Sequence, residues 1–294
     1  YKIPEGSRTA KGKAVVNLIQ LQPDEKIKAI IPTTDFDESK SLAFFTKNGI
    51  VKRTNLSEFK NIRSVGVRAI SLDENDELVT ALIAQTYDDM PVSDPENELS
   101  VETEVLEVEE LQNEIDEDNV NTEEDANSGD ETMLFVVTKK GMCLKFKISK
   151  VRQMGRTARG VTGIKFKEPG DEVVGAAVIE SNDQEILSIS QKGIGKRTTA
   201  DEYRLTNRGG KGVICMKLTS RTGDLVGVVM VDEEQDLMAL TSSGKMIRVD
   251  MQSIRKAGRN TSGVIVVNVE GDDVVSIATC PKAEEGDEGD EDDD

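Results

Sequence analysis

The chain has 294 residues, with 36% hydrophobic and 3% aromatic side chains, no Trp, no His and a formal net charge of −19. The charge is unevenly spread: residues 88–131 hold 19 acidic side chains and no Lys or Arg, residues 281–294 hold nine acidic side chains and one Lys, and the remainder carries a net charge of +8. A basic folded part joined to two acidic segments indicates a polyanionic partner and an acidic competitor within the same chain.

Several classes of protein are excluded by what the composition lacks. The cysteines are three in number and far apart (Cys143, Cys215 and Cys280), so with no His the sequence supports neither a zinc site nor a disulfide framework. Because there is no long apolar stretch and no signal peptide, we expect a soluble, cytoplasmic protein.

The chain begins with half of a repeating unit. Gly12 and the stretch 24–31 match later units, but no hairpin precedes them, so we expect a fragment that lacks its upstream partner strands. One full unit follows at 41–84. The acidic segment 88–131 is then predicted to be a largely disordered loop, with a transient helix over 101–115 as the alternative. Three more units occupy 132–180, 184–232 and 235–280, and the tail 281–294 is predicted to be disordered.

Each unit reads as four short strands. In the third full unit these are 185–190, 194–198, 212–218 and 224–231, and a tight turn joins the first two. The Gly that closes this turn recurs as Gly49, Gly141, Gly193 and Gly244, the last three spaced by 52 and 51 residues, and a second Gly recurs as Gly12, Gly66, Gly160, Gly212 and Gly263. Helical periodicity is absent. A unit of this length with a glycine turn predicts an all-β, propeller-like ring of four-stranded blades rather than a sandwich.

Two columns of cations follow from aligning the units. Four residues after the turn glycine stand Arg53, Lys145, Arg197 and Arg248, and Lys52 and Lys196 precede two of them where Leu144 and Ile247 stand in the other units. Four residues before the second glycine stand Arg8, Arg156, Arg208 and Arg259, whereas the second blade has a loop two residues shorter with Arg63 near that position. Lys and Arg are common at outward strand positions, but recurrence in two columns argues against coincidence.

A regular ring of cations fits a regular polyanion, and duplex DNA carries a charge every ~1.7 Å of its axis. Contacts at blade spacing would grip the backbone without reading bases, and the few aromatics argue against a platform for single strands. The loop 207–212 adds Gly209, Gly210 and Lys211 to the candidates, since its glycines permit close backbone approach. The remaining predicted DNA contacts are Lys147, Arg159, Arg255 and Lys256.

The repeats resemble those of the C-terminal domain of DNA gyrase A, the β-pinwheel. The stretches that carry the resemblance are 2–5, 15–18, 48–54, 193–198 and 258–264, and it covers the chain apart from the acidic insertion and the tail. It implies a pinwheel domain over 1–280, interrupted by 88–131, with four full blades and a partial one where the family has about six. It also implies a rim that wraps duplex DNA, so that the holoenzyme introduces negative supercoils.

The resemblance sets further expectations and some differences. The holoenzyme would be a heterotetramer containing gyrase B and a second copy of gyrase A and would use ATP and Mg²⁺, with no cofactor in this fragment. The family's first-blade Gln-Arg-Arg-Gly-Gly-Lys-Gly box is only partly matched at 208–212, in a later repeat, so we treat 207–212 as an ordinary contact loop. The acidic insertion is not part of the family pattern, whereas the tail resembles the family's acidic C-terminus.

Three other functions remain as alternatives. An enzyme is disfavoured because the chain has no His, no nucleophile constellation and no phosphate-binding loop, and Tyr1, Tyr87 and Tyr203 are not the DNA-cleaving tyrosine, which lies in an upstream domain of such enzymes. A protein-binding propeller would not need repeated cations. The corresponding domain of topoisomerase IV is the closest alternative among DNA binders.

Overall fold

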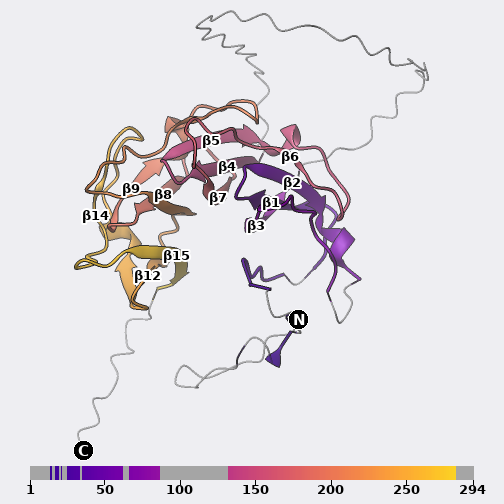
Figure 1. Cartoon of the computed structure of the whole chain (residues 1–294), viewed down its shortest axis with the longest axis horizontal. Coiled ribbons are helices and arrows are strands. Elements are labelled where there is room, and N and C mark those ends of the chain that lie inside the picture. Colours follow the sequence, from indigo (N-terminus) through magenta and orange to yellow (C-terminus); the bar gives the residue numbers. More distant parts are fainter. Residues whose placement is uncertain are drawn as a thin grey trace, which may run out of the picture.

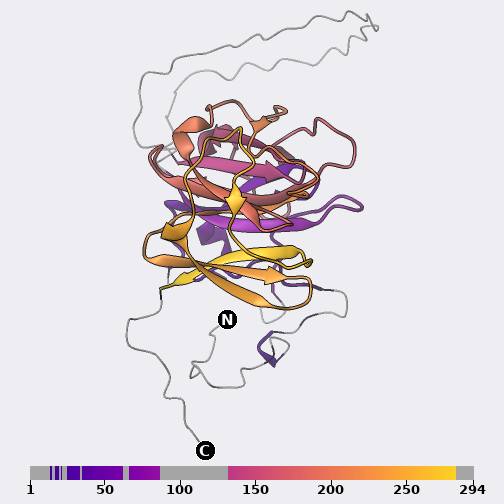
Figure 2. The same ribbon diagram turned by 90° about the vertical axis from the view of Figure 1, so that its left-hand side faces the viewer.

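The computed structural model describes residues 14, 17–19, 21, 25–33, 35–61, 66–86 and 132–282. Four small antiparallel sheets follow one another around an open arc, in the order of the sequence (Figure 1). Viewed from its left-hand side, the arc presents the orange and yellow strands of the last sheet in front (Figure 2). The predicted all-β, propeller-like architecture is confirmed.

The four repeats share a hairpin, a 3₁₀ turn and a last strand, and the second, third and fourth also have a two-residue strand among the described residues. The first contains β1 (Lys40–Thr46), β2 (Ile50–Asn55), the 3₁₀ turn η2 (Leu56–Phe59) and β3 (Leu78–Gln85). The second contains β4 (Met133–Thr138), β5 (Met142–Lys147), η3 (Ile148–Lys150), β6 (Val161–Thr162) and β7 (Val173–Ile179). The third contains β8 (Glu185–Ser190), β9 (Ile194–Thr199), η4 (Ala200–Glu202), β10 (Val213–Ile214) and β11 (Leu225–Met230). The fourth contains β12 (Gln235–Thr241), β13 (Met246–Asp250), η5 (Met251–Ser253), β14 (Val264–Ile265) and β15 (Val274–Pro281).

Neighbouring repeats exchange a strand. The first three sheets have the orders β3-β1-β2-β6, β7-β4-β5-β10 and β11-β8-β9-β14, so the short fourth strand of each sheet comes from the following repeat. The sequence predicted four strands in each unit but did not reveal that one of them pairs with the preceding unit. Among the described residues the last sheet has three strands, β13-β12-β15. Figure 1 shows β3 and β7 facing the middle of the arc, with β6 and β14 at its outer edge.

The recurring glycines stand where one repeat touches the backbone of the next. Gly193 has φ +72°, and a Cβ there would lie 2.0 Å from the carbonyl oxygen of Val267 in the next repeat. Gly212 has φ +75°, and a Cβ there would lie 2.2 Å from the carbonyl oxygen of Cys143 in the preceding repeat. Both positions need a left-handed backbone and no side chain. The repeat pattern read from the sequence is therefore set by contacts between blades.

The apolar cores lie between adjacent sheets rather than within one closed centre. One cluster joins Phe45 and Ala84 of the first sheet to Leu134 and Phe146 of the second. Similar clusters join the second sheet to the third and the third to the fourth. In the two middle sheets, β4 and β8 are buried on both faces, because alternate residues of each strand belong to different clusters. Leu134 packs toward the first sheet and Phe135 toward the third, while Ile186 packs toward the second sheet and Leu187 toward the fourth.

Parts of the predictions lie outside the described residues. These are the insertion 88–131 with its alternative helix at 101–115, the tail beyond 282, and Arg8, Arg63, Tyr1 and Tyr87.

Candidate nucleic-acid interface

The first cation column faces inward in three of its four members. Arg53, Lys145 and Arg197 are 5%, 4% and 9% exposed, so the prediction that they stand on an outer rim is wrong for them. These cations are buried because a segment of the following repeat, which leads to the exchanged strand, covers each of them. The segments 152–160, 204–212 and 255–263, here called straps, run from each 3₁₀ turn to the exchanged strand. Each strap crosses a cation of the preceding repeat through a parallel bridge: Arg53 with Gln153, Lys145 with Leu205, and Arg197 with Lys256.

Two of these inward cations, Lys145 and Arg197, bind backbone carbonyls and side-chain oxygens. Lys145 Nζ donates to Asn182 Oδ1 at 2.9 Å and to the Ala200 carbonyl at 2.7 Å, and burial lowers its pKa. Arg197 Nε donates to the Ile254 carbonyl at 2.7 Å and lies 3.7 Å from a carboxylate oxygen of Glu185. Such buried groups are already hydrogen-bonded and desolvated, so they serve the fold rather than a phosphate.

The prediction of an outer-rim position is also wrong for Lys52 and Lys196, because both side chains are 0% exposed. Lys52 Nζ donates to the carbonyls of Ala69 and Arg156 at 2.5 and 2.7 Å. Lys196 Nζ donates to the carbonyls of Gly258 and Arg259 at 2.6 and 2.5 Å. Lys196 therefore binds a strap from inside the molecule, and Lys52 binds both a strap and the segment that contains Ala69.

Arg248, in the fourth repeat, differs from the rest of its column. Its side chain is 40% exposed, and its Nε donates to Asp236 Oδ2 at 2.7 Å and its Nη2 to the Pro281 carbonyl at 2.6 Å. An ion pair with a neighbouring strand occupies this guanidinium, so it is a weak candidate for a phosphate contact.

The second column stands at the surface as predicted. Arg156, Arg208 and Arg259 are half-buried, and each hydrogen-bonds backbone of the preceding repeat. Arg156 Nη1 donates to the Glu58 carbonyl at 3.1 Å, and Arg259 Nη1 to the Ile214 carbonyl at 3.2 Å. These guanidinium groups are held in place but keep donors and exposed surface for an anion.

Arg208 belongs to the glycine-rich strap of the third repeat. Its Nε donates to the Lys150 carbonyl at 2.8 Å and its Nη1 to the Thr162 carbonyl at 3.0 Å. Gly209 has φ +81°, and its N–H donates to the Gly163 carbonyl at 2.6 Å. Gly210 accepts from the N–H of Lys165, and Lys211 is exposed. The glycines thus allow this strap to pack directly on the preceding repeat.

The remaining predicted contacts have mixed surroundings. Arg159 is exposed and its Nε donates to both carboxylate oxygens of Asp73 at 2.6 Å. Lys256 is exposed but pairs with Glu185, and Lys147 is half-buried. Arg255 is exposed.

A third column was missed by sequence reasoning except for Arg255. Eight residues before the second glycine stand Arg152, Arg204 and Arg255, all exposed. Within the part of the chain that the structure describes, no hydrogen bond or ion pair engages their side chains. Aligning the units on the second glycine at this distance would have found them. Together with Lys211, they are the cations of the straps most available to a ligand.

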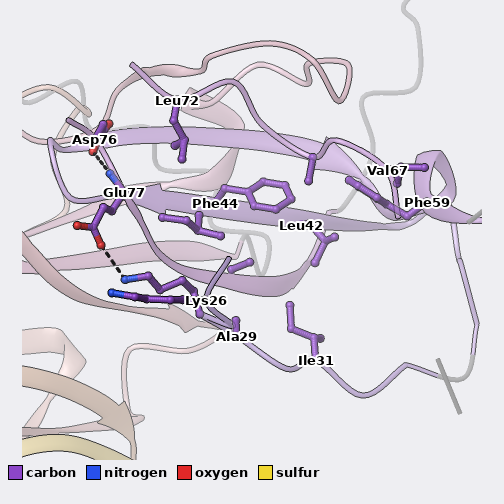
Figure 3. Close-up of a pocket in the computed structure, with 14 residues that line it drawn as sticks. Lys26, Ala29, Ile31, Leu42, Phe44, Phe59, Val67, Leu72, Asp76 and Glu77 are labelled. Atoms are coloured by element: carbon purple, nitrogen blue, oxygen red, sulfur yellow. Dashed lines mark hydrogen bonds and ion pairs between the residues drawn. The ribbon is translucent and has the colours of Figure 1, made fainter. Parts of the chain in front are cut away.

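One hollow in the described part of the chain lies beside the first sheet. A pocket of about 670 Å³ lies between the segment 25–31 and the first sheet, lined mainly by apolar side chains such as Leu42, Phe44 and Phe59 (Figure 3). Its acids are engaged in structure: Asp76 Oδ1 accepts from the N–H groups of Asn48 and Glu77, and Glu77 pairs with Lys28 at 2.8 Å. Among the described residues no group of three or more His, Cys, Asp or Glu side chains is placed to hold a metal ion. No helix of the described residues is long and apolar enough to cross a membrane.

Comparison with known proteins identifies the family. The family model described as DNA gyrase C-terminal domain, beta-propeller, matches residues 1–34, 40–85, 132–180, 184–232 and 235–281. DNA gyrase A of Campylobacter fetus is 73% identical over 293 residues, which are 98% of this chain and 32% of the relative. DNA gyrase A of Campylobacter jejuni is 71% identical over 290 residues, again 98% of this chain and 32% of the relative. The chain thus spans about a third of the length of these relatives.

Solved structures show the same fold at low sequence identity. The C-terminal domain of DNA topoisomerase IV matches with a TM-score of 0.70 and 23% identity over 92% of this chain and 71% of that chain. The DNA gyrase A C-terminal domain matches with a TM-score of 0.69 and 22% identity over 92% of this chain and 75% of that chain. These two structural matches do not separate gyrase from topoisomerase IV, whereas the close sequence relatives are gyrase A proteins. The chain belongs to the family of DNA gyrase C-terminal, propeller-like domains.

Proposed function

We propose that this chain binds duplex DNA along its straps and bends it around the outer edge of the arc, as the wrapping domain of a gyrase A protein. One observation carries the proposal: three successive straps present an exposed arginine at the same position, Arg152, Arg204 and Arg255, each four residues before a surface arginine anchored on the preceding repeat. A cation pair repeated from blade to blade matches a ligand whose charge repeats along its length.

The chemistry of the straps favours backbone contact. Arginine binds phosphate oxygens through two parallel N–H donors. Backbone carbonyls of the preceding repeat hold three of these arginines, Arg156, Arg208 and Arg259, in place. Bending a stiff duplex over a short path costs several kcal/mol, on the order of 1–6 for smooth bends of 40–90°. Several contacts of modest strength, held at fixed spacing, can offset that cost, whereas one strong contact would not impose curvature.

The wider role follows from the family. We propose that the domain acts within an ATP-dependent type II topoisomerase that introduces negative supercoils, together with gyrase B and a second copy of gyrase A. ATP, Mg²⁺ and the DNA-cleaving tyrosine would then belong to parts of the complex outside this chain.

Binding assays with matched nucleic acids test the proposal. We expect the protein to bind labelled duplexes of unrelated sequence with similar affinity and single strands more weakly, because phosphates rather than bases are contacted. Preference for single strands, or strong dependence on sequence, would contradict backbone wrapping. Absence of any DNA binding would favour a protein-binding propeller instead.

A further inference from the structure

We infer that Lys52 and Lys196 are positioning residues for DNA binding, which hold the surface arginines Arg156 and Arg259 through the carbonyls of their own backbone. This inference rests on the proposed function and adds an internal part to the DNA-binding surface. The two lysines were predicted to touch DNA themselves, but they lie at 0% exposure beneath the loops that carry the arginines.

The same contact occurs twice in equivalent places. Lys52 and Lys196 both stand three residues after a turn glycine, and Arg156 and Arg259 both stand four residues before a second glycine. In both cases the Nζ atom of the lysine donates to the carbonyl of the arginine, at 2.7 Å from Lys52 and 2.5 Å from Lys196. Each Nζ also reaches a second backbone carbonyl, Ala69 or Gly258. Two repeats therefore share one device.

The device acts at the base of the arginine and not at its tip. The lysine fixes the arginine's own carbonyl, while the guanidinium is steadied by the preceding repeat through Glu58 or Ile214. Fixing both ends limits the conformations available to a long side chain, so less entropy is lost when it binds a phosphate. An arginine without the internal bond would reach the same anion at a larger entropic cost.

The second sheet supplies a natural comparison. Leu144 takes the place of the lysine there, and the strap above it contains Gly210, whose added Cβ would lie 3.6 Å from Leu144 Cδ1. Its arginine, Arg208, is held instead by two donated bonds, to the Lys150 and Thr162 carbonyls. Among the described residues, two strap arginines thus have an ammonium beneath them and one is anchored without it.

The surroundings of the two lysines make them sensitive to alkaline pH. Burial lowers the pKa of each to about 8. Lys52 faces Glu58 and lies 5.6 Å from the centre of the Phe44 ring, and Lys196 faces Glu202, Cys143, Cys215 and Arg259. A phosphate brought near Arg156 or Arg259 favours the protonated lysine, so binding above pH 8 takes up protons and weakens as pH rises.

Double-mutant cycles test the inference directly. Loss of one phosphate contact should weaken DNA binding roughly threefold to fivefold. We therefore expect Arg259→Gln to weaken binding by this factor in the wild-type protein and hardly at all in the Lys196→Met protein. The cycle of Lys52→Met with Arg156→Gln should behave alike. In the comparison cycle, Leu144→Met should leave the effect of Arg208→Gln unchanged. Additive effects in both lysine cycles would overturn the inference.

Thermal unfolding of every variant separates positioning from loss of fold. If a methionine variant no longer unfolds cooperatively, the wild-type pH profile decides: affinity should fall between pH 7 and pH 9.5 and should fall less in the Arg156→Gln, Arg259→Gln protein. Cys215→Ser is the control for a buried thiol beside Lys196, because hydrogen bonds led by that from Cys143 lower the pKa of Cys215 against the effect of its burial. If the pH dependence of unfolding shows the lowered lysine pKa and the wild-type binding profile is still flat, positioning is refuted, whereas a wild-type protein that does not bind DNA at pH 7 would refute the proposed function itself.

Discussion

Replacing the three exposed strap arginines should reduce the salt dependence of DNA binding without harming the fold. In the Arg152→Gln, Arg204→Gln, Arg255→Gln protein, three phosphate contacts are lost. Each contact contributes about 0.9 to the slope of log K against log salt, so the slope should become less steep by about 2.7. For six to nine contacts in total, the wild-type slope is expected to lie between about −5 and −8.

The measurement is fluorescence anisotropy of a labelled duplex over a series of KCl concentrations. Because the three side chains are exposed and hold no structural bond among the described residues, the free energy of unfolding should change by no more than about 0.5 kcal/mol for each substitution. Thermal or denaturant unfolding checks this before any binding result is interpreted.

A matched variant controls for charge alone. Lys47, Lys140 and Lys192 lie in the hairpin turns, at the end of each hairpin opposite the 3₁₀ turn, where they pair with Glu172, Asp224 and Asp273. Changing these three to Gln removes the same charge, and the slope should change by less than about 1. If the lysine variant alters the slope as much as the arginine variant does, DNA binds through general charge and the strap account fails.

Three other predictions concern the insertion, the repeat glycines and the buried lysines. Replacing 88–131 by the five residues that join the next two repeats (180–184) should tighten DNA binding, because 19 acidic residues no longer compete with DNA for the straps. Equal affinity would mean that the insertion does not compete with DNA. Gly212→Ala should lower the free energy of unfolding by more than about 2 kcal/mol, because the added Cβ meets the Cys143 carbonyl. Gly66→Ala should lower it by only about 1 kcal/mol, because Gly66 has a similar φ but no atom within 4 Å of an added Cβ. Equal losses in denaturant titrations would show that the contact with Cys143 is unimportant. Between pH 8 and 10 the wild-type free energy of unfolding should rise relative to Lys196→Met by roughly 1.4 kcal/mol per pH unit, since the unfolded lysine, with its usual pKa of 10.5, keeps a proton that the folded one has released; a constant difference would mean that its pKa is not lowered.

The fold could be predicted from the sequence because local sequence features mark each repeat. Turn glycines such as Gly193 require a left-handed backbone, and apolar strands follow them at a constant distance. The exchange of β6, β10 and β14 between repeats was not visible, since a two-residue strand leaves no pattern of its own. The partner of such a strand is fixed by long-range contacts that one sequence does not show.

The cation columns were detected correctly but interpreted unevenly. Arg53 and Arg156 recur in the same way, yet one is 5% exposed and the other stands at the surface. Recurrence indicates that a position is constrained, and burial decides whether the constraint is structural or functional. Because the straps cover the hairpins only through strand exchange, the sequence could not tell the inward column from the outward one. The exposed arginines Arg152 and Arg204 were not predicted because the units were not compared at the position eight residues before the second glycine.

We expect the arginines of the straps to curve a double helix around the outer edge of the arc. The most direct measurement is to seal a nicked plasmid with ligase in the presence of the protein and to separate the topoisomers after deproteinisation. We expect wild-type protein to shift the distribution of linking numbers in proportion to the amount bound, and the Arg152, Arg204 and Arg255 triple variant to shift it much less. A wild-type distribution that matches the protein-free control, at concentrations where the plasmid is fully bound, would contradict the account.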